Sequence, residues 1–206
     1  MRILMIGGTR FVGRHITQAA LDAGHEVTLL HRGESGTDLF PQAVHVYADR
    51  NRDLSALCGA EWDATIDVSA YLPKQVADLA LTLEGSGGQY VYISSVSVYE
   101  PPAKPGYSED SPVQKLPPGQ VPEVVDEKTY GPLKVLCEQA AVSQFGPDTL
   151  VIRPTYVIGP HDHSGRFTSW VQRIARGGEV LAPGFPDRPI QLIDARDQAE
   201  IGRAHV

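Results

Sequence analysis

The sequence has few cysteines, an excess of acidic over basic residues and no long apolar run. Cys58 and Cys137 are its two cysteines among 206 residues, and thiols so far apart give neither a disulfide framework nor the spacing of a metal site. The 18 Lys and Arg against 25 Asp and Glu leave a net charge of −7, which argues against broad, charge-driven binding of nucleic acid. No segment approaches the roughly 20 apolar residues of a membrane span. The first apolar run is broken by Gly7, Gly8 and Arg10, unlike a signal peptide, so we expect a soluble, cytoplasmic protein without a nucleic-acid or membrane partner.

The first 32 residues form a pattern of strand, glycine turn, helix and strand. Arg2–Ile6 is a short apolar run that Gly7 and Gly8 interrupt. Apolar residues then recur at helical spacing as far as Gly24, which is typical of a residue that closes a helix. Val27–Leu30 follows as a second buried strand. A unit of this length predicts two parallel strands joined by a right-handed helical crossover.

The glycines of this unit indicate a dinucleotide site. Gly7 and Gly8 lie where a strand turns into a helix, and their lack of a Cβ lets the backbone approach a pyrophosphate at the positive end of that helix. Gly13 lets the helix lie close to the sheet, while Arg10 replaces the usual middle glycine and places a cation beside the phosphates. A glycine turn that binds nothing is the alternative. We predict that the cofactor contacts Gly7, Gly8, Thr9, Arg10, Phe11, Val12 and Gly13.

The end of the second strand bears on which dinucleotide is bound. An acidic residue there binds the 2′-hydroxyl of NAD, whereas an arginine suits the 2′-phosphate of NADP. Arg32 stands at this position and Glu34 comes slightly late. We therefore expect an NAD(P) cofactor with a preference for NADP. A solvated surface arginine is the alternative.

Further strands and helices alternate along the chain. Asp49 and Arg50 follow the third strand and are assigned to the cofactor site; Asp49 could reach the adenine amino group, and Asp53 could equally begin a helix as its N-cap. Ser69 and Tyr71 follow the fourth strand at the carboxyl edge of the sheet, where ligands bind in open α/β folds, and are assigned to the cofactor and the substrate respectively. The alternation predicts an α/β protein, a Rossmann-type doubly wound parallel sheet with helices on both faces. Later strands are expected at Ala43–Tyr47, Trp62–Val68, Gln89–Ile93 and Thr149–Ile152, and helices from Pro73 to Leu83 and from Lys128 to Phe145.

Residues 100–122 differ from the rest of the chain. Seven prolines and little periodicity predict a long loop, and long loops in compact domains are often functional. An insertion without a function is the alternative. The prolines are Pro101, Pro102, Pro105, Pro112, Pro117, Pro118 and Pro122.

Two further motifs carry acid–base chemistry. Tyr130 and Lys134 lie one turn apart on a predicted helix and share a face. An ammonium near a phenol favours the phenolate, so we expect the pKa of Tyr130 to fall and the residue to act as an acid or base. Ser95 and Ser97 follow the fifth strand, where a serine can hydrogen-bond a substrate oxygen and the tyrosine hydroxyl. Chance spacing and an ordinary polar strand end are the alternatives.

Together these motifs resemble the short-chain dehydrogenase/reductase superfamily, in its extended or atypical branch among the NAD-dependent epimerases and dehydratases. The resemblance covers nearly the whole chain. GGTRFVG (residues 7–13) is similar to the nucleotide loop of atypical members, SSVSVY (94–99) to the serine segment and YGPLK (130–134) to the Tyr-x-x-x-Lys pair. Residues 152–160 resemble the segment that opens the substrate region.

The resemblance implies a mechanism. Tyr130 exchanges a proton with a substrate hydroxyl or carbonyl, Ser95 orients that oxygen, and Lys134 holds the nicotinamide ribose and lowers the pKa of Tyr130. The cofactor carries the hydride. Extended members are often dimers through two helices beside the active site, so a homodimer that uses the Tyr130 helix is compatible with the sequence.

Departures from the family pattern narrow the substrate. Val96 and Ser97 stand where sugar 4,6-dehydratases carry an Asp-Glu pair, which disfavours a dehydratase. Tyr156 replaces the asparagine of many nucleotide-sugar epimerases, which weakens that assignment without excluding it. The spacing from Ser95 to Tyr130 is long for the branch, and the proline-rich loop fills it. We assign Tyr71, Ser97, Tyr156 and Arg166 to substrate binding.

The C-terminal quarter contains a loop, a helix and an abrupt end. Three ligand-type residues in a row, at 161–163, rarely share one metal, so we expect no metal and a loop at the substrate edge. A helix is expected over about 165–176, a strand over 189–193 and the start of another helix near 194–197. We divide the chain into a cofactor-binding domain, 1–153, and the start of a substrate-binding region, 154–206. Residues 201–206 lack helical periodicity and look like a translated sequencing adapter, so we expect the natural gene product to be longer.

These observations predict an NAD(P)-dependent oxidoreductase or epimerase that acts on a hydroxyl or carbonyl group of a small polar substrate, sugar-like substrates included. A nucleotide-sugar epimerase is one alternative. A non-catalytic dinucleotide-binding module, or an RNA-associated one like the family's stem-loop-binding relatives, is an alternative from another class. The acidic charge counts against RNA, and the intact Ser95, Tyr130 and Lys134 count against a module without catalysis.

Overall fold

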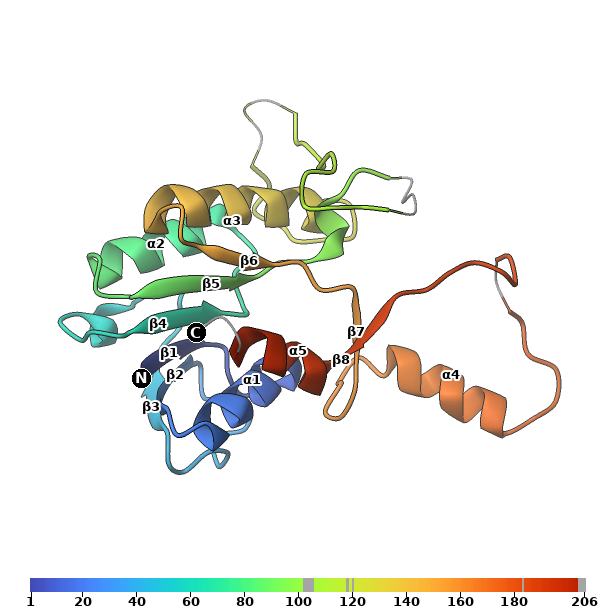
Figure 1. Cartoon of the computed structure of the whole chain (residues 1–206), viewed down its shortest axis with the longest axis horizontal. Helices are drawn as coiled ribbons and strands as arrows, with labels where there is room; N and C mark the ends of the chain where they lie inside the picture. Colours follow the sequence, from blue (N-terminus) through green and yellow to red (C-terminus); the bar gives the residue numbers. More distant parts are fainter. Residues whose placement is uncertain (102–105, 118, 120, 183, 204–206) are drawn as a thin grey trace.

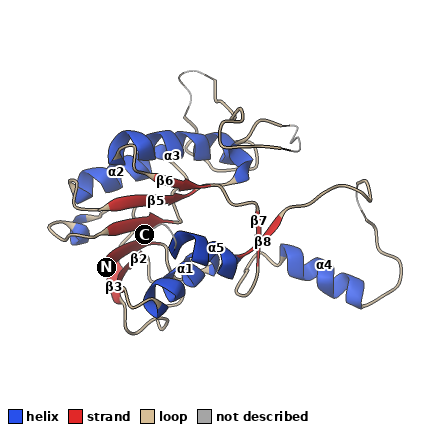
Figure 2. Ribbon diagram, viewed as in Figure 1, coloured by secondary structure: helices blue, strands red, loops and turns tan. Residues whose placement is uncertain are grey.

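A six-stranded parallel sheet lies between two layers of helices (Figures 1 and 2). The computed structural model describes residues 1–101, 106–117, 119, 121–182 and 184–203. The strand order is β3-β2-β1-β4-β5-β6, and every neighbouring pair is parallel. The strands are β1 (Arg2–Ile6), β2 (Glu26–His31), β3 (Val44–Tyr47), β4 (Ala64–Asp67), β5 (Gln89–Ile93) and β6 (Leu150–Ile152).

The sheet is apolar on both faces because both are covered. α1 (Phe11–Asp22) and α5 (Ala195–Arg203) pack against each other on one side, and α2 (Pro73–Leu83) and α3 (Tyr130–Phe145) do so on the other (Figure 1). Successive residues of a strand point to opposite faces. In β1, Ile3 and Met5 therefore join the core beneath α1, while Leu4 and Ile6 join the core beneath α2 and α3. Such strands read as continuous apolar runs, which is the pattern that the sequence shows.

The predicted fold class is confirmed, with small shifts at the ends of several elements. Gly24 follows the end of α1 with a φ of +79°, as expected of a glycine that closes a helix. The strand predicted over 189–193 lies instead at β8 (Leu192–Asp194), where it pairs in parallel with β7 (Tyr156–Ile158), a strand that the sequence did not predict. Pro189 has no backbone N–H and cannot donate to such a ladder.

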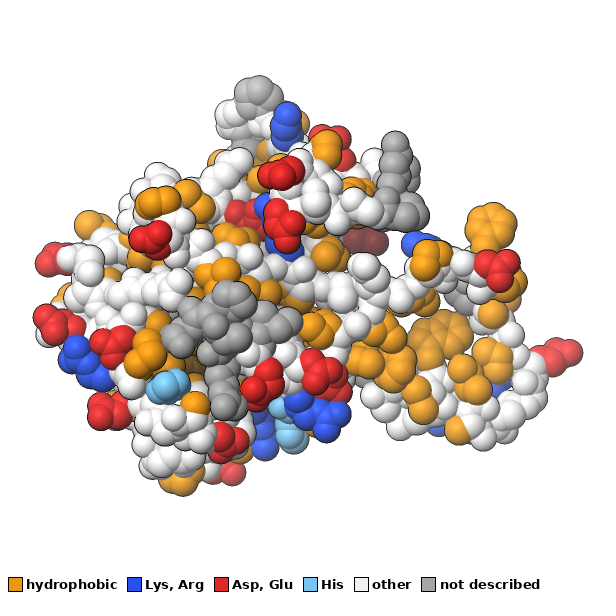
Figure 3. Space-filling view, viewed as in Figure 1, with side chains coloured by type: hydrophobic (Ala, Val, Ile, Leu, Met, Phe, Trp, Pro, Cys, Tyr) orange, Lys and Arg blue, Asp and Glu red, His pale blue; other side chains and the backbone are white. Residues whose placement is uncertain are grey.

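Between β7 and β8 the chain leaves the sheet and returns to it. This excursion, residues 159–191, contains α4 (Arg166–Ala175), which stands away from the sheet in Figure 1. Apolar side chains gather on this part of the surface (Figure 3), and α4 exposes Phe167, Trp170, Val171 and Ile174. After β8, α5 packs back against α1.

The proline-rich segment is irregular where the structure describes it, apart from a bridge between Tyr99 and Val113. Pro102, Pro105, Pro118 and the last three residues of the chain lie outside the described part. The division of the chain at residue 153 stays a prediction. No described helix is long and apolar enough to cross a membrane.

Candidate active site

The loop between β1 and α1 is built for close contacts that only glycine permits. Gly7 has a φ of +90°, and its N–H donates to the carbonyl of Leu30 at 3.0 Å. A Cβ on Gly13 would lie 2.3 Å from the Gly7 carbonyl oxygen, far closer than van der Waals contact allows. The first turn of α1 therefore lies directly against the loop, and its free N–H groups face the carboxyl edge of the sheet.

A cleft of about 730 Å³ opens at this edge, beyond the ends of β1, β2 and β4. Its volume lies within the range of small-molecule sites, about 300–1,000 Å³. No acidic residue occurs in the first turn of α1, and the Arg10 side chain makes no capping hydrogen bond there. The residues present therefore fit a dinucleotide with its diphosphate at the start of α1. The predicted cofactor residues that line the cleft are Gly7, Thr9, Arg10, Phe11, Val12, Gly13, Arg32, Asp49, Arg50 and Ser69.

Gly8 does not line the cleft. It is buried behind the loop, where a Cβ would meet Thr17 Oγ1 at 2.5 Å and Leu29 at 2.7 Å. Thr17 Oγ1 donates to the Gly8 carbonyl at 3.0 Å. Gly8 thus has a packing reason of its own, and its assignment to cofactor binding stays a prediction.

The far end of the cleft combines cationic and acidic groups. Arg32 and Glu34 both line it and form an ion pair of 2.7 Å. Asp49 accepts hydrogen bonds from the backbone N–H and side-chain amide of Asn51. The backbone hydrogen bond is the main reason why the pKa of Asp49 lies below its ordinary value. Glu34, which stands two residues after Arg32 in the sequence, thus lies at the cleft and pairs with that arginine.

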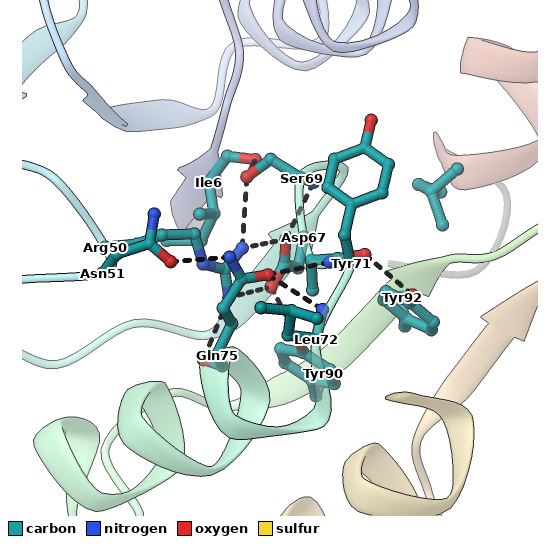
Figure 4. A network of polar contacts seen from close by, with 12 residues as sticks. Ile6, Arg50, Asn51, Asp67, Ser69, Tyr71, Leu72, Gln75, Tyr90 and Tyr92 are labelled. Atoms are coloured by element: carbon teal, nitrogen blue, oxygen red, sulfur yellow. Dashed lines mark hydrogen bonds and ion pairs between the residues drawn. The ribbon is translucent and has the colours of Figure 1, made fainter. Parts of the chain in front are cut away.

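Arg50 lies at the floor of the cleft in a buried polar network (Figure 4). Its guanidinium donates to both Asp67 carboxylate oxygens at 2.8 Å, to Ser69 Oγ at 3.1 Å and to the Gln75 carbonyl at 3.0 Å. Tyr90 donates to Asp67 at 2.9 Å. Burial favours a higher pKa for Asp67, but the charge and hydrogen bonds of Arg50 outweigh it, so this pKa is lowered. Most donors of Arg50 are thus engaged by the protein.

The second group of predicted residues meets where β5 ends and α3 begins. Tyr130 is the first residue of α3, and the Ser95 hydroxyl lies near enough to act on its pKa. Ser95 Oγ donates to Ser97 Oγ at 3.1 Å and accepts from the Ser97 N–H at the same distance. Tyr71 lies beside Tyr130, with ring centroids 6.2 Å apart. Lys134 is buried and donates from Nζ to the carbonyls of Ala70 and Ile93, at 3.0 and 2.9 Å.

The prediction that Lys134 lowers the pKa of Tyr130 is wrong in this structure. Burial raises the pKa of Tyr130 above its ordinary value, while the nearby Ser95 hydroxyl acts in the opposite direction. Lys134 Nζ lies 6.0 Å from the centroid of the Tyr130 ring, and burial lowers its own pKa to about 8. The ammonium is directed to two backbone carbonyls, so it has little effect on the phenol.

A second cleft, of about 510 Å³, adjoins Tyr130. Ser97, predicted to bind substrate, lines it together with Tyr99 and Gln114. Gln114 donates from its side chain to the Ser97 carbonyl and from its N–H to the Val98 carbonyl, each at 2.7 Å. Part of the proline-rich segment is therefore bound to the serine segment and forms a wall of this cleft.

Arg153 at the end of β6 supports this wall. It pairs with Glu138 of α3 at 2.7 Å and donates to Tyr99 Oη and to the Glu109 carbonyl, each at 3.0 Å. Ser94, the neighbour of Ser95, donates to Glu138. One guanidinium thus connects the sheet, α3 and the proline-rich segment.

The remaining predicted substrate residues form a pair of their own. The guanidinium carbon of Arg166 lies 4.8 Å from the centroid of the Tyr156 ring. The charge of Arg166 slightly opposes the rise in the pKa of Tyr130 that burial causes. Tyr71 lines the first cleft, whereas Tyr156 and Arg166 line neither cleft.

Sequence reasoning missed several residues that line the two clefts. Asn51, Gln75 and His163 line the first, and Gln114, Asp126 and Glu127 line the second. The nearness of Asn51 to Asp49 was a usable signal. His163 and Gln114 reach their clefts through tertiary packing, for which the sequence offers no local sign. Among the described residues, no three His, Cys, Asp or Glu side chains come together as a metal site.

Comparison with known proteins identifies the family. A family model described as the NAD dependent epimerase/dehydratase family matches residues 3–203. The chain belongs to this family. The resemblance stated from the glycine loop, the serine segment and the Tyr-Lys pair is thereby confirmed.

The individual relatives match this chain either at low sequence identity or over a short part of its length. The chloroplast stem-loop binding protein of 41 kDa b from Arabidopsis thaliana is 26% identical over 96% of this chain and 53% of its own length; the chain thus spans about half of that relative. A bifunctional pinoresinol-lariciresinol reductase from Forsythia intermedia is 32% identical over 34% of the chain and 25% of its own length.

Solved structures of family enzymes share the fold. A UDP-galactose 4-epimerase superposes with a TM-score of 0.75 at 21% identity, covering 99% of this chain and 71% of that one. The enzyme WbmG of Bordetella bronchiseptica, in complex with NAD and UDP, gives a TM-score of 0.76 at 17% identity, covering 98% and 67%. At these identities the likeness concerns the fold alone.

Proposed function

We propose that this protein is an NAD(P)-dependent oxidoreductase or epimerase that acts on a hydroxyl or carbonyl group of a small polar substrate. The observation that carries the proposal is the position of Tyr130. It lines the second cleft, has the Ser95 hydroxyl nearby, and lies against Tyr71, which lines the first cleft. A phenol at this place can exchange a proton with a substrate oxygen while the substrate carbon faces the cofactor.

Each residue has a separate task in this reaction. The nicotinamide supplies hydride transfer when it is bound. Ser95 orients the reacting oxygen, and Tyr130 gives or takes the proton at its hydroxyl. Lys134 lines neither cleft; its ammonium is buried behind Tyr71 and Tyr130, within 6.0 Å of both ring centroids. Its remaining donor is available to a ribose hydroxyl, because two backbone carbonyls engage the others.

The choice between NAD and NADP depends on Arg32 and Glu34. Arg32 favours the 2′-phosphate of NADP, and we retain the preference for NADP that it implies. Glu34 opposes this preference, because a carboxylate paired with Arg32 at 2.7 Å repels a phosphate. WbmG, which shares the fold, was solved with NAD.

The decisive experiment replaces Tyr130 with phenylalanine. Substrates are screened as sugars, sugar alcohols and UDP-galactose, with cofactor reduction followed by absorbance and epimerisation by NMR. We expect Tyr130→Phe to lower kcat by at least about 100-fold and to leave the Kd for the cofactor unchanged. Tyr47→Phe, at an exposed position of β3, is the matched control. Full turnover by Tyr130→Phe would refute the catalytic assignment.

Two alternatives have specific support. The fold match to a UDP-galactose 4-epimerase favours a nucleotide-sugar epimerase, and turnover of UDP-galactose in the same screen decides it. The similarity to a stem-loop binding protein favours an RNA-associated module, against which stands the net charge of −7. Salt-sensitive binding of a stem-loop RNA, together with no turnover in the screen, would support the module. A homodimer through α3 is proposed from the family resemblance, and sedimentation tests it.

A further inference from the structure

The segment that follows β7 lies along the first two turns of α1. His15 Nε2 is 2.9 Å from the Pro160 carbonyl oxygen and donates to it. The rings of Phe11 and His163 meet edge to face, with centroids 6.5 Å apart. Phe11 and His15 are four residues apart and share one face of α1. Residues 160–163 therefore run back along this face towards the start of the helix.

Hydrogen bonds fix the shape of this segment. Asp162 accepts from the backbone N–H of Ser164 at 2.9 Å and from its hydroxyl at 2.6 Å, and its own N–H donates to the Gly159 carbonyl at 3.3 Å. His161 has a φ of +66°, a left-handed conformation that costs a non-glycine residue free energy. The surrounding contacts hold this turn, and the turn places His163 at the cleft.

His163 lines the same end of the dinucleotide cleft as the glycine loop. Gly7, Arg10 and Phe11 line that end from the side of β1 and α1, and His163 reaches it from the excursion after β7. Within the described part of the chain, the ring nitrogens of His163 take part in no hydrogen bond. An imidazole carries an N–H donor in either protonation state, and here that donor is available to a ligand.

We infer that His163 binds the diphosphate of the dinucleotide, with a ring N–H donating to a phosphate oxygen from the wall opposite the glycine loop. Helix α1 and Arg10 provide the other donors. The inference rests on the proposed cofactor function and adds a second contact surface to it. The excursion, which carries Arg166 of the predicted substrate site, thereby also contacts the cofactor.

The test is a calorimetric titration of His163→Ala with ADP-ribose, adenosine and NADP. Removing one hydrogen bond to a charged group weakens binding by about tenfold. We expect this loss for ADP-ribose and NADP, and no change for adenosine, which has no phosphate. His163→Gln keeps an N–H donor and is expected to recover most of the affinity. His25→Ala, beyond the other end of α1, is the matched control.

Three outcomes would overturn the inference. Equal Kd values of His163→Ala and wild type for ADP-ribose show that the ring makes no contact. A tenfold loss for adenosine as well shows that the substitution acts through the fold and not through the diphosphate. Wild type that binds none of the three ligands contradicts the proposed function itself. If wild type binds ADP-ribose and the His163 variants bind it equally well, only the inference about His163 is refuted and the proposed function is unaffected.

Discussion

Arg50 and Asp67 form a two-point ion pair beneath the dinucleotide cleft, with both N–O distances at 2.8 Å. Asp67 is fully buried at the end of β4, and Arg50 is 9% exposed. Arg50 also donates to the Gln75 carbonyl of α2 and to the hydroxyl of Ser69, the second residue after β4. The floor of the cleft is thus fixed by an ion pair that is almost completely buried.

Asp67→Asn is expected to lower the free energy of unfolding by about 3–5 kcal/mol, because it leaves the Arg50 charge buried without compensation. Urea unfolding measures this change in the free energy of unfolding. Asp78→Asn removes the exposed partner of Lys74 and is expected to change stability by less than about 1 kcal/mol. Similar values for the two variants would contradict a buried pair of structural importance.

Gly13→Ala is expected to raise the Kd for NADP by at least about tenfold, since the new Cβ would meet the Gly7 carbonyl oxygen and force the loop or helix to move. Titration calorimetry measures this change. Gly87→Ala is the control, because its Cβ would meet the flexible end of Leu83 in a turn that does not line the cleft. An unchanged Kd for Gly13→Ala would show that the loop does not hold the cofactor.

Glu34→Gln is expected to tighten NADP binding by about three- to fivefold and to leave NAD almost unchanged, because it removes a charge that repels the 2′-phosphate and frees Arg32. Arg32→Ala is expected to act in the opposite direction, weakening NADP more than NAD. Glu61→Gln is the control, because its partner Arg2 begins β1 at the amino end of the strand, away from the cleft. Equal changes for both cofactors would contradict a role of this pair in selecting them.

Lys134 predicts a pH dependence of stability. Burial lowers its pKa from 10.5 to about 8 in the folded chain, so between these values the unfolded chain binds more protons. The contribution of Lys134 is therefore fully present above pH 10.5 and is lost as the pH falls towards 8. As the pH rises from about 8 to 10.5, wild type should gain at most about 3 kcal/mol of stability relative to Lys134→Met. A difference that does not vary with pH in urea unfolding would contradict the lowered pKa.

Local patterns predicted the fold well because they are repeated along the chain. Each local signal predicts one type of element without knowledge of the rest of the fold. The spacing of apolar residues predicts a strand or a helix, and the glycines at 7, 13 and 24 mark where an element begins, packs closely or ends. The buried pairing of Arg50 could not be predicted, since its partner Asp67 comes 17 residues later and no local pattern links the two. The short strand β7 escaped prediction and β8 was placed too early in the chain, because three residues carry little periodicity.

The candidate site was only partly predictable for the same reason. Tyr130, Ser95 and Tyr71 were expected near one another and lie together. The direction of Lys134 was not predictable from its spacing to Tyr130, because two backbone carbonyls from other elements attract its ammonium. The roles assigned to these residues stay predictions until turnover is measured.

The parallel pairing of β7 with β8 fixes both ends of the excursion that carries α4. A segment attached in this way can gain, lose or exchange residues while the register of the six-stranded sheet is kept, because lengthening a loop whose ends are already joined costs little. Natural selection can therefore reshape the part of the molecule that carries Arg166 and leave Tyr130 and the glycine loop as they are.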